Sequence, residues 1–337
     1  MSKAKTAAGR ASAAVLADAV RGGDRRALAR AITLIESRRA DHRAEAARLL
    51  ERLLRFGGGS VRLGISGAPG VGKSTFVETL GLHIIGQGHR VAVLAVDPSS
   101  RITGGSILGD KTRMDELARA PEAFIRPSPS AGTLGGVARR TREAILVCEA
   151  AGFDVVLVET VGVGQSETAV ADMVDFFLLL LSPAGGDELQ GIKKGIVELA
   201  DLVVVNKADG ELEGVAIAAA AEYTAALNLL RRDPGRGAAR VLTCSAREGM
   251  GIAEVWRQVE DIARAATASG ERDARRARQS GAWMWREVDE SLEAAFRDHP
   301  AVARELERLE RRVRDGEITP TAAARKLLEA FGAPADE

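Results

Sequence analysis

The chain has 337 residues, 46% of them hydrophobic and 28% charged, so it is long enough to bury a full hydrophobic core. Basic and acidic residues both number 47, and this balance argues against nucleic acid or an anionic membrane as the main partner. No apolar run approaches the roughly 18 residues of a membrane span, and Cys148 and Cys244 lie in apolar stretches typical of reduced, buried thiols. Composition therefore predicts one main domain with helical additions.

The first seventeen residues contain no acidic side chain and include Lys3, Lys5 and Arg10, a composition that weakly resembles a mitochondrial transit peptide. Alanine and arginine are abundant throughout the chain, however, so biased composition is sufficient to explain this segment. We therefore expect the cytoplasm rather than the mitochondrial matrix.

Two amphipathic helices are predicted at the start of the chain, over Asp24–Ser37 and Arg43–Phe56, because leucine and isoleucine recur at helical spacing. Gly57-Gly58-Gly59 is predicted to be a hinge into the domain that follows. The arginines on the outer helix faces fit either a partner surface or an ordinary solvated face.

The stretch VRLGISGAPGVGKST, from Val61 to Thr75, predicts a buried strand, a glycine-rich loop and a helix. Its G-x-x-x-x-G-K-S pattern is a P-loop, in which backbone amides converge on a polyphosphate that side chains would otherwise keep away. Lys73 is expected to reach the β- and γ-phosphates, and Ser74 to offer a hydroxyl to Mg²⁺. The predicted nucleotide-binding residues of this loop are Gly67, Ala68, Pro69, Gly70, Val71, Gly72, Lys73, Ser74 and Thr75.

The next predicted strand, Arg90–Val96, delivers Asp97 to the edge of the sheet where ligands bind in parallel α/β folds. Asp97 is therefore placed to reach the metal, although it would equally cap a turn at Asp97-Pro98-Ser99-Ser100. The long glycine-containing loop that continues to Asp110 has the composition of a switch that becomes ordered on ligand binding.

A strand over Asp154–Val158 leads into Glu159-Thr160-Val161-Gly162. In P-loop enzymes the acid at this position holds the metal, usually through water, and the glycine lets an amide meet the γ-phosphate. Glu159 stands where aspartate is more common. Gln165 is a candidate to orient the attacking water, and a plain loop-to-helix polar contact remains the alternative.

The strand Phe176–Leu181 is apolar throughout, as a central parallel strand should be. A charged, glycine-containing loop follows it from Ser182 to Lys194, at the same edge of the sheet. This loop is a candidate third switch, with a plain surface connection as the alternative.

Strand Leu202–Val205 leads into Asn206-Lys207-Ala208-Asp209, an N-K-x-D motif. Asp209 is expected to accept hydrogen bonds from N1–H and the 2-amino group of guanine, neither of which adenine offers, and Lys207 to pack over the base. Strand Arg240–Thr243 then leads into Cys244-Ser245-Ala246-Arg247, whose backbone amides are expected to meet the guanine 6-oxygen. The ordered motifs predict a GTPase.

The tail changes character after Gly251–Thr267, a segment that is expected to close the domain. Helices are predicted over Arg272–Phe296, Pro300–Arg314 and Pro320–Phe331, with Thr319 as N-cap. Trp283 and Trp285 lie in the first of these helices and provide bulky apolar anchors. We expect them to form a homodimer interface, with packing onto the chain's own domain as the alternative.

Taken together, the motifs resemble the MeaB/ArgK family, GTPase chaperones of adenosylcobalamin-dependent methylmalonyl-CoA mutase within the SIMIBI class of metallochaperone-like G proteins. The segments that carry the resemblance are GAPGVGKST, AVDPSS, RPSPSAGTLGG, ETVGVGQSE, SPAGGDELQGIKKGI, NKAD and TCSAREG. The resemblance implies a P-loop NTPase fold, a mostly parallel sheet flanked by helices with helical extensions at both ends. It divides the chain into an N-terminal extension (1–59), a GTPase domain (60–268) and a C-terminal dimerisation arm (269–337).

The motifs themselves predict the catalytic residues Lys73, Asp97, Glu159 and Gln165. Beyond the P-loop, the predicted nucleotide-binding residues are Gly162, Asn206, Lys207, Asp209, Ser245, Ala246 and Arg247. The resemblance implies that Ser74, Asp97, Asp110 and Glu159 are magnesium and switch residues, and that Asp187, Gln190 and Lys193 are third-switch residues. The expected ligands are GTP or GDP and Mg²⁺, and the expected partner is an adenosylcobalamin-dependent acyl-CoA mutase, with no nucleic acid or membrane.

Other functions fit the sequence less well. An ArgK-type kinase of a periplasmic amino-acid-binding transport protein would need a catalytic base and a protein-substrate groove, neither of which the sequence identifies. A nickel-delivery GTPase would need clusters of Cys and His, and this sequence has two cysteines and four scattered histidines. A signal-recognition GTPase would need a methionine-rich groove, and the five methionines here are spread thinly. No cobalamin-binding D-x-H-x-x-G motif is present, so the mutase is expected to hold the cofactor.

Overall fold

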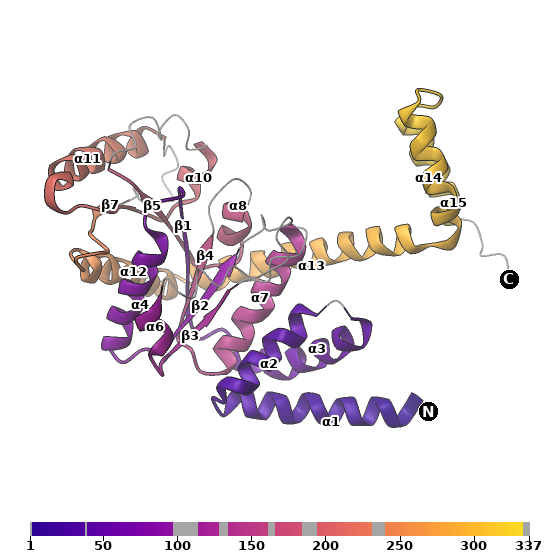
Figure 1. Ribbon diagram of the computed structural model, residues 1–337, viewed down its shortest axis with the longest axis horizontal. Helices are drawn as coiled ribbons and strands as arrows, with labels where there is room; N and C mark the ends of the chain where they lie inside the picture. The colour runs from indigo at the N-terminus through magenta and orange to yellow at the C-terminus, as the bar shows by residue number, and fades with distance from the viewer. Residues whose placement is uncertain are drawn as a thin grey trace. The chain divides into compact units, whose positions relative to one another are not determined.

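Seven parallel strands form the central sheet, in the order β3-β2-β4-β1-β5-β6-β7 (Figure 1). The computed structural model describes residues 2–37, 39–96, 114–127, 134–160, 166–183, 194–230 and 240–332. These residues separate into two compact units, 1–276 and 277–337, and the sheet belongs to the first. The strands are β1 (Val61–Gly67), β2 (Val91–Val96), β3 (Ala123–Arg126), β4 (Val155–Thr160), β5 (Phe176–Leu181), β6 (Leu202–Val205) and β7 (Arg240–Thr243).

Helices cover both faces of the sheet, which explains why the inner strands β2, β5 and β6 are apolar at every position. Every residue of β2 and β5, for example, is buried. The helices that share the main core on one face are α4 (Lys73–Gly86), α6 (Asp115–Arg119) and α12 (Ile252–Ala268). Those on the other face are α7 (Leu134–Ala150), α8 (Ser166–Ala171) and α10 (Lys194–Leu199), while α11 (Glu213–Leu230) packs against β6 and β7. The predicted parallel α/β fold is confirmed.

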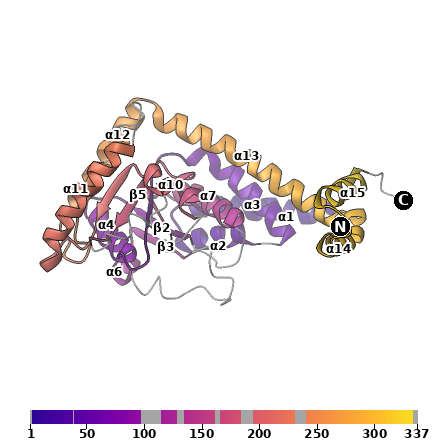
Figure 2. The same cartoon turned by 90° about the horizontal axis from the view of Figure 1, so that it is seen from above.

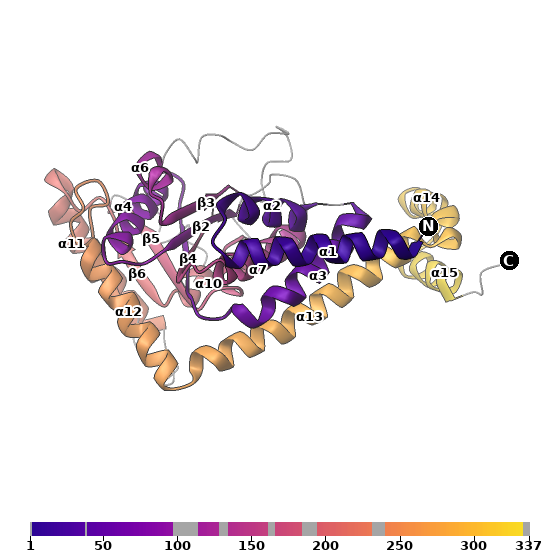
Figure 3. The same ribbon diagram turned by 90° about the horizontal axis from the view of Figure 1, so that it is seen from below.

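Three N-terminal helices pack on one another and on α7, as Figures 2 and 3 show from two sides. They are α1 (Ser2–Arg21), α2 (Arg25–Glu36) and α3 (Ala40–Leu53), followed by the 3₁₀ turn η1 (Leu54–Phe56). Asp24 caps α2 by accepting from the Arg26 and Ala27 amides, and these bonds lower the pKa of its carboxyl group. The apolar side of this layer includes Leu28, Ile32 and Leu49, all fully buried.

The glycine segment before β1 is fastened by hydrogen bonds, which differs from the predicted hinge. Gly58 N donates to Glu149 Oε2 at 2.7 Å, and Gly58 O accepts from Arg276 Nη1 at 2.6 Å. Arg276 also binds both carboxylate oxygens of the buried Asp175, at 2.6 and 2.7 Å. The start of α13 (Glu271–Asp298) is thereby tied to the edge of the sheet where the strands begin.

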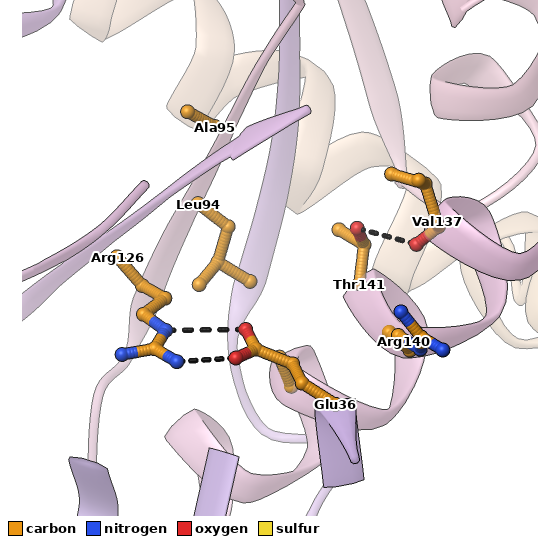
Figure 4. A pocket seen from close by; sticks show the side chains of 8 residues that line it. Glu36, Leu94, Ala95, Arg126, Val137, Arg140 and Thr141 are labelled. Atoms are coloured by element: carbon orange, nitrogen blue, oxygen red, sulfur yellow. Dashed lines mark hydrogen bonds and ion pairs between the residues drawn. The ribbon is translucent and has the colours of Figure 1, made fainter. Parts of the chain in front are cut away.

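A small cavity of about 20 Å³ lies between α2, α7 and strands β2 and β3. Figure 4 shows Arg126 of β3 facing Glu36 of α2 there, and the two side chains form a two-pronged ion pair. Arg126 Nη2 lies 3.4 Å from Thr33 Oγ1. At the other end of β3, Arg25 Nη1 donates to Pro121 O at 3.0 Å. Helix α2 is therefore connected to both ends of edge strand β3.

The second unit contains the rest of α13, α14 (Pro300–Arg314) and α15 (Pro320–Gly332). Helices α14 and α15 pack together around buried Val302, Leu309 and Ala323. The rings of Phe296 and Phe331 lie 5.2 Å apart. Thr319 Oγ1 accepts from Ala322 N at 3.3 Å, as expected of the predicted N-cap.

Some elements differ from the prediction. Helices α1 and α11 were not expected, and α11 is difficult to recognise because alanines on all its faces hide the 3.6-residue period. Strand β4 continues to Thr160, so Glu159 lies within the strand rather than beyond its end. Among the described residues, no helix has the length and apolar character needed to cross a membrane.

Candidate functional site

The loop between β1 and α4 has the backbone of a phosphate-binding turn. Gly72 has φ of 92°, and a Cβ there would lie 2.8 Å from Asn206 Nδ2. A Cβ on Gly67 would lie 2.3 Å from Leu180 O, so this strand end also requires glycine. Gly72 caps α4 without a side-chain hydrogen bond, and the start of an α-helix is a favourable position for an anion.

Lys73 lies inside this loop rather than on the surface. Its side-chain nitrogen donates to Gly67 O at 2.7 Å and to Ala68 O at 3.0 Å. The residue is only 8% exposed, so water screens its positive charge only weakly and the charge interacts more strongly with groups in the loop. A polyphosphate in the loop would compete for the same ammonium group.

Ser74 and Glu159 meet at the start of α4. Ser74 Oγ donates to Glu159 Oε1 at 3.3 Å, and Glu159 is 5% exposed. A hydroxyl and a carboxylate that converge at a phosphate-binding loop are the oxygen donors that Mg²⁺ takes together with substrate phosphates. The two side chains therefore fit the expected metal. Within the described ranges, no group of three or more His, Cys, Asp or Glu side chains forms a separate metal site.

Sequence reasoning did not identify a hydroxyl pair beneath this position. Thr160 Oγ1 donates to Ser66 Oγ at 2.8 Å, and both residues are buried. The bond joins the strand that enters the P-loop to the strand that carries Glu159. Single hydroxyl residues inside strands have no spacing signal, so only the pairing of β1 with β4 reveals this contact.

Asn206 joins the P-loop to the segment after β7. Its Nδ2 donates to Val71 O at 2.8 Å, and its Oδ1 accepts from Ala246 N at 3.0 Å. The side chain is almost completely buried, so both bonds form out of water, where an unpaired amide would be costly. The phosphate loop and the predicted base-binding loop are thus one connected structure.

Lys207 and Asp209 also contact the P-loop and the segment after β7, respectively. Lys207 adopts φ of 60°, the only positive φ among the described non-glycine residues, and its side-chain nitrogen donates to Gly70 O at 2.7 Å. Asp209 Oδ2 accepts from Ser245 Oγ at 2.5 Å. That hydroxyl also accepts from Glu248 N at 3.1 Å, which fixes its direction. The second carboxylate oxygen of Asp209 is not part of this bond.

The backbone amides of residues 244–247 do not all have the same role. Cys244 N donates to Val205 O and Ser245 N donates to Met250 O, both at 2.9 Å. These two amides are therefore used within the fold. Two amides are candidates for a base oxygen: that of Arg247, and that of Ala246, which donates to Asn206 Oδ1 and would have to share or give up this bond.

Seven predicted site residues lie outside the described residues. They are Asp97, Asp110, Gly162, Gln165, Asp187, Gln190 and Lys193. The structure brings together the other predicted residues, from the P-loop, Glu159, the N-K-x-D segment and the 244–247 segment. They occupy the carboxyl ends of β1, β4, β6 and β7, which is where parallel α/β folds bind ligands.

Known proteins with similar sequences cover nearly all of this chain. A probable GTPase of Mycobacterium tuberculosis is 59% identical over 93% of this chain and 94% of its own length. The mitochondrial methylmalonic aciduria type A homolog of Mus musculus is 52% identical, over 92% of this chain and 77% of its own. A crystal structure of an LAO/AO transport system kinase is 41% identical, with a TM-score of 0.76, and covers 96% of this chain and 98% of its own.

The model of one family, the methylmalonyl-CoA mutase-associated GTPase MeaB, matches residues 28–301. The match includes every described residue of the P-loop, the N-K-x-D segment and the 244–247 segment. The predicted MeaB/ArgK resemblance and the predicted GTPase activity are both confirmed. This chain belongs to the MeaB family of GTPases.

Proposed function

We propose that the protein is a G-protein chaperone that hydrolyses GTP to GDP and phosphate, and so gates cofactor loading and protects an adenosylcobalamin-dependent methylmalonyl-CoA mutase. The observation that carries this proposal is the match of residues 28–301 to a mutase-associated GTPase family. The mouse relative, named for methylmalonic aciduria type A, supports it independently.

The chemical step is in-line attack of water on the γ-phosphoryl group of GTP. Backbone amides of the P-loop position the phosphates, and Lys73 neutralises the charge that develops on the β- and γ-oxygens. Gln165 is proposed to orient the water. Asp209 selects guanine, because its carboxylate can accept from N1–H and the 2-amino group.

Ser74 and Glu159, with Asp97 and Asp110, are proposed to hold Mg²⁺. When bound, the ion would neutralise phosphate charge and fix the triphosphate in place. The contact between Ser74 Oγ and Glu159 Oε1 supports this assignment for two of the four residues.

Gating requires that the partner bind one nucleotide state better than the other. We assign the switch role to the segments that contain Asp110, Gln165 and the third-switch residues Asp187, Gln190 and Lys193. The triphosphate would hold these segments in one arrangement and hydrolysis would release them. By linkage, the mutase should then change nucleotide affinity to the same extent as nucleotide changes mutase affinity.

The proposal keeps the division into an N-terminal extension (1–59), a GTPase domain (60–268) and a C-terminal dimerisation arm (269–337). Helix α13 exposes large apolar side chains on its surface: Met284 is 56% exposed, Trp285 62% and Leu292 58%. Side chains of this kind, at helical spacing, are suited to a homodimer interface. The cytoplasmic location stays a prediction.

A kinase activity is the second candidate, because a crystal structure of an LAO/AO transport system kinase shares the fold over 96% of this chain. The two functions differ in the acceptor of the γ-phosphoryl group, which is water for a GTPase and a protein hydroxyl or similar group for a kinase. Incubation of the protein with γ-radiolabelled GTP, in the presence of the mutase or of a periplasmic binding protein, distinguishes the two functions. Label on protein would favour the kinase.

The test of the proposed function is phosphate release from GTP and from ATP, with and without the mutase in its apo and cofactor-loaded forms. We expect slow, GTP-specific turnover that rises with the mutase and disappears in Lys73→Ala. If neither form of the mutase changes the rate of GTP hydrolysis, the GTPase assignment stands but the proposed partner is wrong.

A further inference from the structure

Thr79 connects helix α4 to the predicted base-binding loop. Its Oγ1 lies 2.7 Å from Ala246 O and 3.0 Å from Thr75 O. A threonine inside a helix commonly bonds only to the carbonyl one turn before it. Here the single hydroxyl proton has a second acceptor, at the shorter distance, in a segment far away in the sequence. Nothing about a lone threonine in a helix predicts this contact.

Ala246 is consequently held on both sides. Its amide donates to Asn206 Oδ1 at 3.0 Å, and its carbonyl accepts from Thr79. Asn206 in turn donates to Val71 O of the P-loop. Ala246 is 3% exposed; its bond to Asn206 is buried, and its bond to Thr79 is partly buried. The amides of Ala246 and Arg247 therefore take their position from two anchors, one in the N-K-x-D segment and one in α4.

We propose that Thr79 is a positioning residue for guanine recognition: its hydroxyl places the amides of Ala246 and Arg247 for the guanine 6-oxygen. The inference rests on the proposed guanine site. Its physical basis is that a hydrogen bond weakens steeply with misalignment, so a small shift of this loop should weaken the bond to the 6-oxygen specifically. Asp209 is proposed to bind N1–H and the 2-amino group of the base, and it is held by Ser245 instead.

A general structural role for Thr79 would give a different result. Helix α12, which follows the loop, is already fastened to α4, because Trp256 is buried and its Nε1 donates to Gln87 Oε1 at 3.1 Å. Removal of one hydroxyl should therefore shift the loop locally without detaching α12 from α4. A purely structural loss would lower the unfolding temperature and weaken all nucleotides alike.

The experiment compares wild type, Thr79→Ala and Thr79→Ser in competition binding against a fluorescent GDP analogue. The competitors are GTP, 6-thio-GTP and ITP. Sulfur is a poor acceptor, so 6-thio-GTP tests the 6-position while keeping N1–H and the 2-amino group. ITP lacks only the 2-amino group and tests Asp209. We expect Thr79→Ala to reduce the preference for GTP over 6-thio-GTP by about two- to tenfold, and to leave the preference over ITP unchanged.

Thr267→Ala is the matched control, because Thr267 Oγ1 donates to Ala263 O at 2.8 Å within its own helix, α12. It should leave both preferences as in wild type, and Thr79→Ser should restore them. In turnover assays Thr79→Ala should raise KM with little change in kcat. An unchanged GTP to 6-thio-GTP ratio in Thr79→Ala, or an equal loss for all three nucleotides, would overturn the role of Thr79 alone. A wild type that discriminates against neither analogue would overturn the guanine site itself.

Discussion

Arg62 and Glu149 form a buried two-pronged ion pair where β1 begins and α7 ends. Arg62 Nε and Nη2 donate to the two carboxylate oxygens at 2.8 and 2.9 Å, and the Glu149 side chain is 1% exposed. Ser60 Oγ and Gly58 N also donate to this carboxylate, at 2.5 and 2.7 Å. The charge of Glu149 is thus fully surrounded by donors, which is the condition under which a buried carboxylate is tolerated.

Arg62→Ala should lower the free energy of unfolding by about 3 to 5 kcal/mol, because it leaves a buried carboxylate without its counter-charge. Urea denaturation followed by circular dichroism measures this loss. Arg257→Ala is the control: Arg257 pairs with Glu254, and the two side chains are 63% and 41% exposed. Its loss should stay within about 1 kcal/mol. Equal effects of the two substitutions would contradict the importance of burial.

Glu149 should also make stability depend on pH. Burial by itself raises the pKa of Glu149, but the hydrogen bonds and charge of Arg62, with bonds from Ser60 and Gly58, outweigh it and hold the pKa below its ordinary value of 4.5. The folded state therefore binds this proton less readily than the unfolded chain, so the stabilisation is present above pH 4.5 and is lost as the pH falls. Unfolding free energies from pH 7 to 3 should fall more steeply for wild type than for Glu149→Gln; parallel curves would refute this.

Asp209→Asn should change the preferred base. An asparagine amide suits xanthine, which carries a 2-oxo acceptor where guanine carries an amine, so GTP affinity should fall on the order of 100-fold while xanthosine triphosphate binding increases. Competition binding with both nucleotides measures the exchange. Lys207→Arg serves as a nearby control that keeps the carboxylate and should keep the preference for GTP. Loss of affinity for both nucleotides in Asp209→Asn would instead indicate damage to the loop.

Trp285→Glu should convert the proposed homodimer to a monomer, because the substitution places a charge in an apolar face that is buried on association. Light scattering after size-exclusion chromatography gives the mass directly. Ile217→Glu on α11 is matched in exposure, at 58% against 62% for Trp285, and should leave the mass unchanged. A wild type of 35.5 kDa in solution would rule out the dimer from the start.

Arg126→Ala should loosen the N-terminal helices without unfolding the sheet, since Arg126 ties Glu36 of α2 to the end of β3. We expect faster amide exchange in α2, with strands β1 and β4 as unaffected internal controls. The double substitution that exchanges Arg126 and Glu36 should recover part of the protection, because it re-forms the pair in reverse. Uniform exchange changes across the sheet would argue against a local link.

Many residues of the candidate site can be recognised from short motifs in the sequence. Lys73, Ser74 and the glycines of the P-loop are recognisable because backbone approach to phosphate demands glycine at set intervals. Asn206 and Asp209 are recognisable because a buried apolar strand precedes them and parallel strands end at a common edge. These features depend on a few neighbouring residues, so the motifs and their spacing were sufficient to predict the GTPase activity, and the family resemblance that they carry implied the mostly parallel fold.

Other features depend on which segments become neighbours in space. The sequence predicts a hinge at glycines 57–59. In the structure, Gly58 is hydrogen-bonded to Glu149 of α7 and to Arg276 of α13, both distant in the sequence. Likewise, Thr79 reaches Ala246 only because α4 packs beside the end of β7. Sequence determined the local chemistry of each loop; strand order and helix packing decided which donors meet which acceptors, because hydrogen bonds between distant residues leave no periodic pattern in the sequence.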